Sequence, residues 1–521
     1  MTFEEYFSFK AIVGDLIRWR VAGKGTRGEG GRSDVEAVLP PRRMWSRAGA
    51  KARKGVAPEI VRRQAIWRTV VRACGSEGTC RLSENVAGSQ LRWAQNLMKL
   101  VNEVRKAVLS GKVTFEKPRM IKIPKGYRDG VREFRDVASF DRLVDRVILS
   151  RMTAYVRDKI ESVLTPYCYS FRKDASVTHQ TAIERLQRYR SEFPDGSLFV
   201  GECDIKRFFD NISHDVVRRR WREIGFDAVA DKVLEAYLAV FSTATGRGLP
   251  QGGSFSTVLA NLVLAAADEA VLRIQCENLF YARFCDDVVF VHPEKEMCRL
   301  AMSAYGRALA ELDLPMHPVQ PFAYKPLDGT STVYYEIKSK GPFAWRQPQT
   351  GEENCSPWLS FLGSQIRFNG ETRIRKESIE KHIRSLERET SRAVREIEKS
   401  GAAGVRAIPG VQEWFARFRN RLIAKGVGYV TAKVEDCRIC WAGAFPNVTD
   451  CADTRMQMRR LDRVREGMLC KVWRMLPSGC GKKRRRYKGK PFSYCGFLEK
   501  AVRPTNMRPR RRRVLLPYSE L

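Results

Sequence analysis

The sequence predicts an α+β fold, with an antiparallel sheet, packed helices and a helical C-terminal region. Three observations lead to this prediction. Strand-like and helical segments alternate between about residues 120 and 370, an amphipathic helical pattern follows from about residue 375, and 43% of the 521 residues are apolar. A chain of this length and composition can bury a large core and form two or three domains.

Residues 1–115 are predicted to form a basic helical extension. The stretch "AGKGTRGEGGRS" is rich in Gly and reads as a loop, whereas "SQLRWAQNLMKLVNEVRKAVLSG" has the apolar spacing of a helix.

The segment "SLFVGECDIKRFFDNISHDVV" predicts a strand that ends in an acidic residue. Residues 198–203 read as the strand and Asp204 follows it. A helix should begin after "FFDN", with Ser213 in its N-cap region. The end of a strand is where proteins with mixed sheets and helices usually present the side chains of a site.

The segment "YARFCDDVVFVHP" places Asp286 and Asp287 between two apolar runs that predict a hairpin. Taken alone, such a pair would mark an exposed turn. Together with Asp204 it would form a cluster whose repulsion, several kcal/mol, calls for divalent cations with oxygen ligands. Two Mg²⁺ ions, or Mn²⁺ in their place, held by these aspartates would suit an in-line phosphoryl displacement.

From about residue 375 the pattern is helical and then basic. The stretch "KESIEKHIRSLERETSRAVREIEKS" has apolar residues at near-helical spacing with charges between them, which predicts a long amphipathic helix. The tail contains "GKKRRRYKGK" and "RPRRRRVLLPYSEL", which suit either phosphate contacts or a solvated tail.

The charge balance indicates a polyanionic partner. Lys and Arg number 94 against 59 Asp and Glu, a net charge of +35, and the 28 basic and 9 acidic residues from Gly401 onward contribute +19 of it. Nucleic acid is therefore favoured over an anionic membrane. No apolar run approaches the ~20 residues that span a bilayer, and the first residues lack a signal-peptide pattern, so we expect a cytoplasmic protein with no membrane partner.

The 14 cysteines are scattered, which suits reduced thiols. Cys437 and Cys440 have metal-ligand spacing in "CRIC", but no second close pair or histidine follows, so buried thiols are favoured over zinc.

The motifs between residues 120 and 370 resemble those of reverse transcriptases, in that family's order. "FCDD" resembles the YADD box, "CDIKRFFDNISHD" the first catalytic motif of the palm, and "LSFLGSQI" the primer grip. Four further segments resemble the fingers motifs, the nucleotide-binding loop and the motif after the hairpin: "IPKGYRDGVREFRDVASFDRLVDRVI", "YCYSFRKDASVTHQTAIERL", "GLPQGGSFSTVLANLVLAAADEAV" and "LAELDLPMHP". The chain is most similar to bacterial enzymes of the group II intron, retron and defence-associated kinds.

The resemblance implies a right-hand polymerase with four parts: a basic N-terminal extension at 1–115, fingers and palm at 116–370, a helical thumb at 371–475 and a basic tail at 476–521. It implies that Asp204, Asp286 and Asp287 are the catalytic, metal-binding residues of an RNA-directed DNA polymerase. The residues implied in nucleotide binding are Phe209, Gln251, Gly252, Lys125, Arg135 and Arg172, with Arg132 as an alternative to Arg135. A large ring at Phe209 would exclude a ribose 2′-hydroxyl and favour dNTPs.

Several positions depart from the family pattern. Phe284 and Cys285 replace the Tyr and Ala of YADD. Gln320 stands where a lysine is common, so His317 or Lys325 would have to serve as the general acid for pyrophosphate.

The biological role we expect is that of a defence-associated bacterial enzyme that copies a dedicated, structured non-coding RNA into DNA. No Cys/His cluster of the endonuclease type follows the thumb, and the chain is longer than a retron enzyme. The alternatives are a group II intron-like maturase that acts mainly by binding RNA, and an RNA-dependent RNA polymerase. The sequence leaves open a homo-oligomer and priming from a protein hydroxyl such as that of Tyr518.

Overall fold

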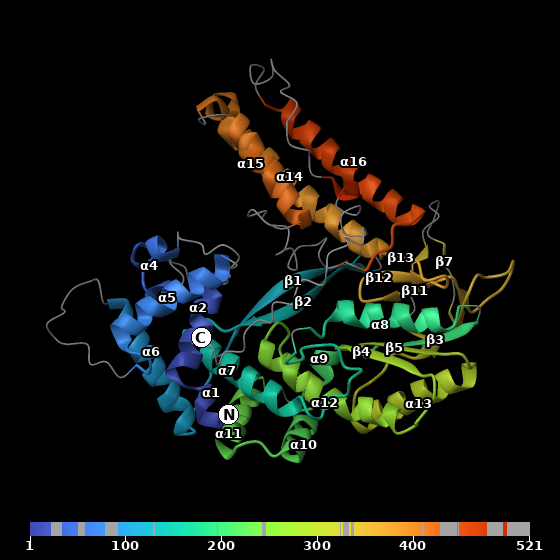
Figure 1. The fold of residues 1–521 in the computed structure, drawn as a ribbon, viewed down its shortest axis with the longest axis horizontal. Helices are drawn as coiled ribbons and strands as arrows, with labels where there is room; N and C mark the ends of the chain where they lie inside the picture. The colour runs from blue at the N-terminus through green and yellow to red at the C-terminus, as the bar shows by residue number, and fades with distance from the viewer. Residues whose placement is uncertain are drawn as a thin grey trace, which may run out of the picture.

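A computed structural model gives the fold of the chain (Figure 1). The residues that it describes are 1–21, 34–49, 58–78, 92–128, 131–174, 176–194, 196–241, 246–322, 325–326, 333–334, 338–407, 411–427, 445, 447–476 and 493–496.

The N-terminal region is helical, as predicted. Helix α6 (Arg92–Leu109) repeats apolar residues at helical spacing, and its buried face includes Trp93, Leu97 and Val104. It packs beside α7 (Leu143–Ile160) of the palm. The other helices of this region are α1 (Phe3–Tyr6), α2 (Phe9–Val21), α3 (Asp34–Ala37), α4 (Arg42–Gly49) and α5 (Pro58–Cys74).

A long hairpin of β1 (Arg119–Arg128) and β2 (Val131–Ser139) follows, in the place of the predicted fingers. Figure 1 shows it rising between the N-terminal helices and the C-terminal helices. Where the hairpin meets the palm, Ala138 N–H donates to Gln251 C=O at 3.1 Å.

The palm is built on a sheet in the order β10-β9-β3-β5-β4, with β6 beside β9. Its central strand β3 (Leu198–Cys203) lies antiparallel to both β5 (Asp287–His292) and β9 (Ser339–Trp345). β4 (Phe280–Phe284) closes one edge, and the short strands on the other side are β6 (Val319–Gln320) and β10 (Cys355–Ser356).

Alternate residues of these strands enter two different cores. Val288 and Phe290 of β5 face the core that contains α12 (Ser254–Leu272) and α13 (Lys295–Glu311). Val289 and Val291 face a second core, beneath α8 (His179–Glu192). Both faces of the sheet are therefore covered, which explains why its strands read as nearly continuous apolar runs.

The remaining palm helices surround these cores. They are α7 (Leu143–Ile160), α9 (Phe208–Asn211), α10 (His214–Ile224) and α11 (Ala228–Val240). Ser213 is the N-cap of α10 as predicted, although its side chain makes no capping hydrogen bond.

Helix α12 corrects one expectation. By length and composition it could cross a membrane, so the statement that no apolar run approaches that length is wrong. In this structure 72% of its apolar stretch is buried inside the protein. Among the described residues it is the one helix that is long and apolar enough to cross a membrane. A core helix surrounded by protein needs an apolar surface all round, which accounts for its composition.

A small sheet follows the palm strands in sequence and contains β11 (Trp358–Phe361), β12 (Ser364–Arg367) and β13 (Thr372–Ile374). Its Leu359, Phe361 and Ile366 join the second palm core, whereas the helices after it stand away from the palm in Figure 1. Three helices follow: α14 (Lys376–Ala407), α15 (Val411–Val427) and α16 (Ala452–Arg474). α14 is the predicted amphipathic helix, and its buried Leu386 and Ala393 join a core with α15 and α16.

These parts confirm the prediction of an α+β fold with a sheet, packed helices and a helical C-terminal region. The hairpin of β1 and β2, the six-stranded sheet and the C-terminal helices lie where the fingers, palm and thumb were predicted along the chain. Nothing in the fold fixes the domain boundaries, which stay predictions. A separate hairpin of β7 (Lys325–Pro326) and β8 (Val333–Tyr334) lies between β6 and β9 in sequence.

Some sequence predictions lie outside the described residues. They concern the stretch "AGKGTRGEGGRS", the thiols of Cys437 and Cys440, both basic runs of the tail and Tyr518. Among the described cysteines none forms a disulfide, and five are buried: Cys74, Cys168, Cys203, Cys298 and Cys355.

Candidate active site

Asp204 lies directly after β3, as predicted, and its backbone is fixed on both sides. Its N–H donates to Ser339 Oγ at 3.1 Å, and its C=O accepts the N–H of His317 at 3.0 Å. The carboxylate is 23% exposed, so it remains accessible from solvent while its position along the chain is held.

Two lysines of the β9 region face the acidic residues at the end of β3. Glu202 lies opposite Lys340 in the antiparallel register, and their ion pair measures 2.5 Å. Two residues earlier in the chain, Lys338 Nζ lies 3.5 Å from Asp204 Oδ2. The Lys340 side chain is 6% exposed and that of Lys338 is 57% exposed. Lys338 can therefore move away from its partner without uncovering a buried contact, whereas Lys340 cannot.

Strands β4 and β5 form the predicted hairpin around the two aspartates. Phe284 pairs with Asp287, which leaves Cys285 and Asp286 as a two-residue loop. Because β5 also pairs with β3, from Cys203 opposite Val288 onward, the loop lies beside the end of β3. Asp286 and Asp287 are thereby brought next to Asp204.

The charges of these aspartates act on one another. Desolvation by the surrounding protein, together with the charges of Asp286 and Asp204, raises the pKa of Asp287 to about 6. Arg375, which precedes α14, acts in the opposite direction. Since Asp287 is exposed at the surface, the neighbouring charges are the cause that the geometry supports best. The three carboxylates therefore form one electrostatic site.

The donor chemistry of this site suits a hard divalent cation. Carboxylate oxygens are ligands that Mg²⁺ and Mn²⁺ prefer, and mutual repulsion among them is relieved by a cation. Within the described part of the chain, no group of three or more His, Cys, Asp and Glu side chains is drawn together closely enough to hold an ion as it stands. The aspartates thus fit a metal ion by charge and donor type, and not as a closed ligand set.

The adjacent rings of Phe208 and Phe209 differ in burial. Phe208 is buried in the palm core, and Phe209 packs against it with a ring separation of 5.2 Å while remaining half-buried. Phe209 C=O accepts Leu249 N–H at 2.8 Å, which joins its turn to the segment before Gln251. A role for Phe209 in selecting the sugar stays a prediction.

The loop containing Gln251 and Gly252 touches the fingers hairpin. Gly252 has φ +92°, and a Cβ at this position would lie 2.3 Å from Cγ1 of Val137 in β2. Glycine is required here for both its conformation and its size. The loop is therefore held against the fingers, at the junction where a nucleotide site was predicted.

The predicted basic contacts are only partly described. Three of them have side chains outside the described residues: Lys125, Arg132 and Arg135. Arg172 pairs with Glu161 through Nε at 2.9 Å and Nη2 at 2.8 Å, and its Nη1 donates to Thr165 C=O at 2.6 Å. These contacts fasten the segment after α7, and a contact between Arg172 and a nucleotide stays a prediction.

The structure also places the two general-acid candidates. The Lys325 side chain lies outside the described residues, and His317 lies beside Asp204 through its backbone bond. Lys338 was not singled out from the sequence, although its ammonium lies against a predicted metal ligand. The sequence signal for Lys338 is its spacing of two residues from Lys340, which matches the spacing of Asp204 from Glu202. This signal can be read only when the pairing of β3 with β9 is known.

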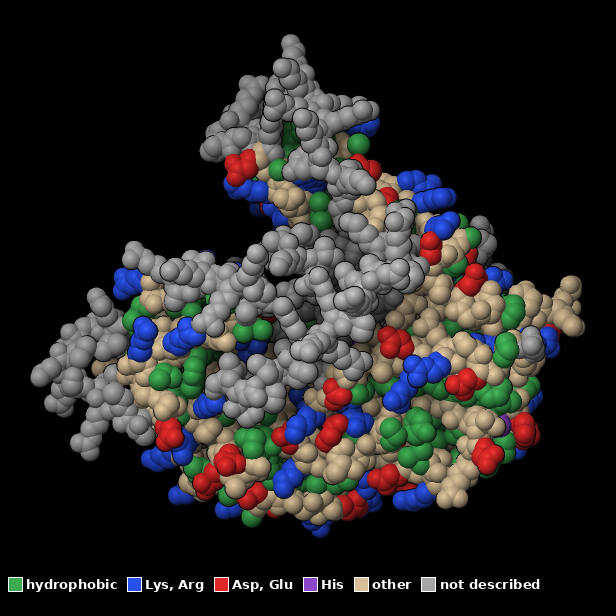
Figure 2. All heavy atoms as spheres, in the orientation of Figure 1, with side chains coloured by type: hydrophobic (Ala, Val, Ile, Leu, Met, Phe, Trp, Pro, Cys, Tyr) green, Lys and Arg blue, Asp and Glu red, His purple; other side chains and the backbone are tan. Residues whose placement is uncertain are grey.

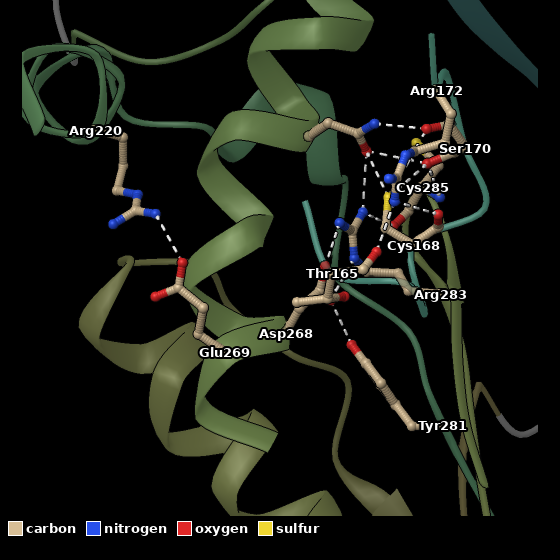
Figure 3. A network of polar contacts seen from close by, with 11 residues as sticks. Thr165, Cys168, Ser170, Arg172, Arg220, Asp268, Glu269, Tyr281, Arg283 and Cys285 are labelled. Carbon is tan, nitrogen blue, oxygen red and sulfur yellow. Dashed lines mark hydrogen bonds and ion pairs between the residues drawn. The ribbon is translucent and has the colours of Figure 1, made fainter. Parts of the chain in front are cut away.

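A buried polar network behind the hairpin was also missed. Figure 3 shows it between α12 and the strand β4, with Arg283 at its centre. Arg283 donates to both carboxylate oxygens of Asp268 at 2.6 Å, and both side chains are completely buried. In the sequence, Asp268 read as one polar residue of a helix and Arg283 as one residue of a strand, so neither indicated the other.

Comparison with known proteins identifies a domain within this chain. Residues 123–319 match the protein family described as "Reverse transcriptase (RNA-dependent DNA polymerase)". This range contains the three aspartates, Phe209 and the loop with Gly252.

Three curated relatives match parts of the chain. The putative COX1/OXI3 intron 1 protein of Saccharomyces cerevisiae is 31% identical over 33% of this chain and 20% of its own length. The retron Ec48 reverse transcriptase of Escherichia coli is 34% identical over 23% of this chain and 29% of its own length. The group II intron-encoded protein LtrA of Lactococcus lactis is 31% identical over 25% of this chain and 22% of its own length. The matches thus span less than a third of each of these relatives.

Proposed function

Residues 123–319 are a reverse-transcriptase domain similar to those of bacterial retron and group II intron proteins, as the motifs predict, and on this premise we propose that the chain is an RNA-directed DNA polymerase. One observation carries the proposal. Asp204 and the hairpin aspartates Asp286 and Asp287 meet at the ends of adjacent strands of the palm sheet.

Divalent ions, two Mg²⁺ with Mn²⁺ as an alternative, would be held by Asp204, Asp286 and Asp287. Reverse-transcriptase domains generally use such ions, which when bound stabilise the negative charge that develops on the attacking and leaving oxygens. The raised pKa of Asp287 supports this assignment, because besides desolvation it reflects the negative charges of Asp286 and Asp204 nearby.

The chain's own residues would orient the reactants. The fixed backbone of Asp204 sets one side of the site, and the hairpin loop sets the other. The glycine at position 252 would let the incoming base pair approach the backbone, and Phe209 would close the space beside the sugar. Lys338 would be released from Asp204 to meet phosphate charge. The substrates are then an RNA template, a primer end and dNTPs, and the product is DNA.

The net charge of the chain supports an RNA partner. On the face in Figure 2, Lys and Arg side chains are interspersed with Asp and Glu over the palm as well as over the N-terminal and thumb helices. With a net charge of +35, binding to phosphates should be strong and salt-dependent.

Primer extension tests the proposed activity. The purified chain is given a defined RNA template with an annealed DNA primer, and dNTPs or rNTPs in the presence of Mg²⁺. Template-complementary DNA that forms only with dNTPs is expected, and the product is sequenced. Equal use of rNTPs would indicate an RNA polymerase instead, and no product from any primed template with either nucleotide would contradict the proposal.

A second candidate is a maturase, because two of the matched relatives are intron-encoded proteins. A maturase acts by binding RNA, so its biological effect should survive replacement of both Asp286 and Asp287 by alanine. The polymerase proposal requires that the same variant lose its effect in the cell.

For the biological role we propose a cytoplasmic, defence-associated enzyme that copies a dedicated non-coding RNA, alone or as a homo-oligomer. The match to a retron protein and the extended basic regions support this role. Sequencing of the RNA and DNA that copurify with the chain tests it. One recurrent RNA with its complementary DNA is expected, whereas a random sample of cellular RNA would contradict the role.

A further inference from the structure

The loop that carries Asp286 holds a backbone conformation that its sequence does not favour. Cys285 has φ +59°, in the left-handed region that most L-residues enter only at an energetic cost. Asp286 has no positive φ, and two-residue hairpin loops with positive φ at the first position alone usually have glycine there. Contacts from outside the loop must therefore hold Cys285.

Both backbone polar groups of Cys285 are held by buried side chains. Its N–H donates to Ser170 Oγ at 3.0 Å, and its C=O accepts Arg283 Nη1 at 3.3 Å. Ser170 and Arg283 are completely buried. One bond fixes the peptide plane before the Cα atom of Cys285 and the other fixes the plane after it. Together they set the two torsions that aim the following aspartates.

Ser170 and Arg283 are in turn fixed by helix α12. The Ser170 hydroxyl donates to Asn261 Oδ1 at 3.0 Å, and Asn261 Nδ2 donates back to Ser170 C=O at 2.7 Å. Arg283 Nη1 donates to the same Asn261 oxygen at 3.1 Å, and its Nε and Nη2 bind Asp268. The Tyr281 hydroxyl completes the set with a 2.5 Å bond to Asp268. Figure 3 shows Ser170, Arg283 and Cys285 beside one another, with Asp268 and Tyr281 on the far side of Arg283.

We propose that Ser170 and Arg283 are positioning residues for Asp286 and Asp287, and that they act through the backbone of Cys285. The network would hold the loop beside Asp204, so that the hairpin carboxylates need less rearrangement when a divalent ion binds. This inference rests on the proposed function, since it assigns residues that position the metal ligands of the same site.

A purely structural role predicts something different. If the network only stabilised the palm, removing the Ser170 hydroxyl would lower the unfolding temperature and leave the ion affinity of the folded protein unchanged. If Ser170 positions the loop, removing its hydroxyl lowers the ion affinity of the folded protein. This loss occurs only while residue 285 resists the left-handed conformation. Glycine at position 285 adopts that conformation without support, so it should remove the dependence on Ser170.

The test is a double-mutant cycle read by Mn²⁺ binding, with free Mn²⁺ followed by its electron paramagnetic resonance signal. The four proteins are the wild type, Ser170→Ala, Cys285→Gly and the double variant. Ser170→Ala should weaken Mn²⁺ binding about tenfold, the order seen when a group that orients a metal ligand is removed. In the Cys285→Gly background the same change should weaken binding less than about twofold. Ser170 is chosen over Arg283 because loss of Arg283 would leave Asp268 charged and buried without its partner.

Two controls separate the possible outcomes. Thr390→Ala removes another buried hydroxyl, which donates to Leu386 C=O at 2.9 Å in the thumb, and should leave Mn²⁺ binding unchanged. An equal loss of Mn²⁺ affinity in both backgrounds of the cycle, or no loss in either, would overturn the inference. Primer extension by the wild type would then still support the proposed function. If the Asp286→Ala, Asp287→Ala double variant bound Mn²⁺ like the wild type, the hairpin would hold no ion, and the proposed metal site would fail together with the inference.

Discussion

The two sides of the β4–β5 hairpin treat charge in opposite ways. On the open side, desolvation and the like charges of Asp286 and Asp204 raise the pKa of Asp287 to about 6. On the buried side, burial disfavours the charge on Arg283, but the bonded Asp268 carboxylate holds its pKa well above the ordinary value. The open side has an excess of negative charge, whereas on the buried side the Arg283 and Asp268 charges balance each other. The open side can therefore accept cations, and the buried side fixes the position of the hairpin that carries the aspartates.

The largest effect should follow from removing charge on the open side. Asp286→Asn should lower the rate of nucleotide incorporation about 10³-fold or more, because a metal ligand accounts for several kcal/mol of transition-state stabilisation. Single-turnover primer extension measures the rate. Glu296→Gln, an exposed carboxylate change on α13, should leave it unchanged. A similar rate for Asp286→Asn and the wild type would show that the open side is not the reaction centre.

Removing charge on the buried side should act on stability instead. Asp268→Asn leaves the Arg283 guanidinium buried without a full counter-charge, which should lower the free energy of unfolding by about 3–5 kcal/mol. Denaturant unfolding measures it. The matched control is Glu235→Gln, which weakens the exposed pair with Arg218 and should cost about 0–1 kcal/mol. Equal costs for the two variants would remove the distinction between the sides.

Disturbing the contact between palm and fingers should have an intermediate effect on nucleotide binding. Gly252→Ala places a Cβ 2.3 Å from Val137 Cγ1 at φ +92°, a strain of about 1–3 kcal/mol. We expect a higher KM for dNTPs, because the loop must move away from the fingers. Steady-state kinetics test this expectation, and an unchanged KM would place the nucleotide elsewhere.

The role of Phe209 in sugar selection can be tested on the open side. Phe209→Ala should lower the preference for dNTPs over rNTPs about 10- to 100-fold, the range expected when a pocket loses an apolar group that excludes a substituent. Competing incorporation on one template measures the preference. If rNTP use does not rise, Phe209 is a packing residue like Phe208.

The smallest effect is a pH dependence of stability. The pKa of about 6 for Asp287 lies above the value near 3.9 of an unfolded aspartate, so the folded state keeps this proton to higher pH. The stabilisation from this group is present below about pH 4 and is lost as the pH rises to about 6. Asp287→Asn should therefore gain stability relative to the wild type over this range. A constant difference would mean that Asp287 titrates normally.

The open side could be predicted from the sequence and the buried side could not. Strand β3, the hairpin and the three aspartates follow from local alternation of apolar and polar residues and from motif order, which are properties of short segments. The bonds from Ser170 to Cys285 and from Arg283 to Asp268 join segments 115 and 15 residues apart. Lys338 required the register of β9 against β3. These contacts depend on packing that no single segment specifies.

The most direct measurement combines rate and stability in one variant, Asp204→Asn. Single-nucleotide incorporation on an RNA template and thermal unfolding are measured on the same preparation. If Asp204 is a metal ligand among like charges, incorporation should fall about 10³-fold while the unfolding temperature stays equal or rises. Retained incorporation, or a loss explained by unfolding, would contradict the account.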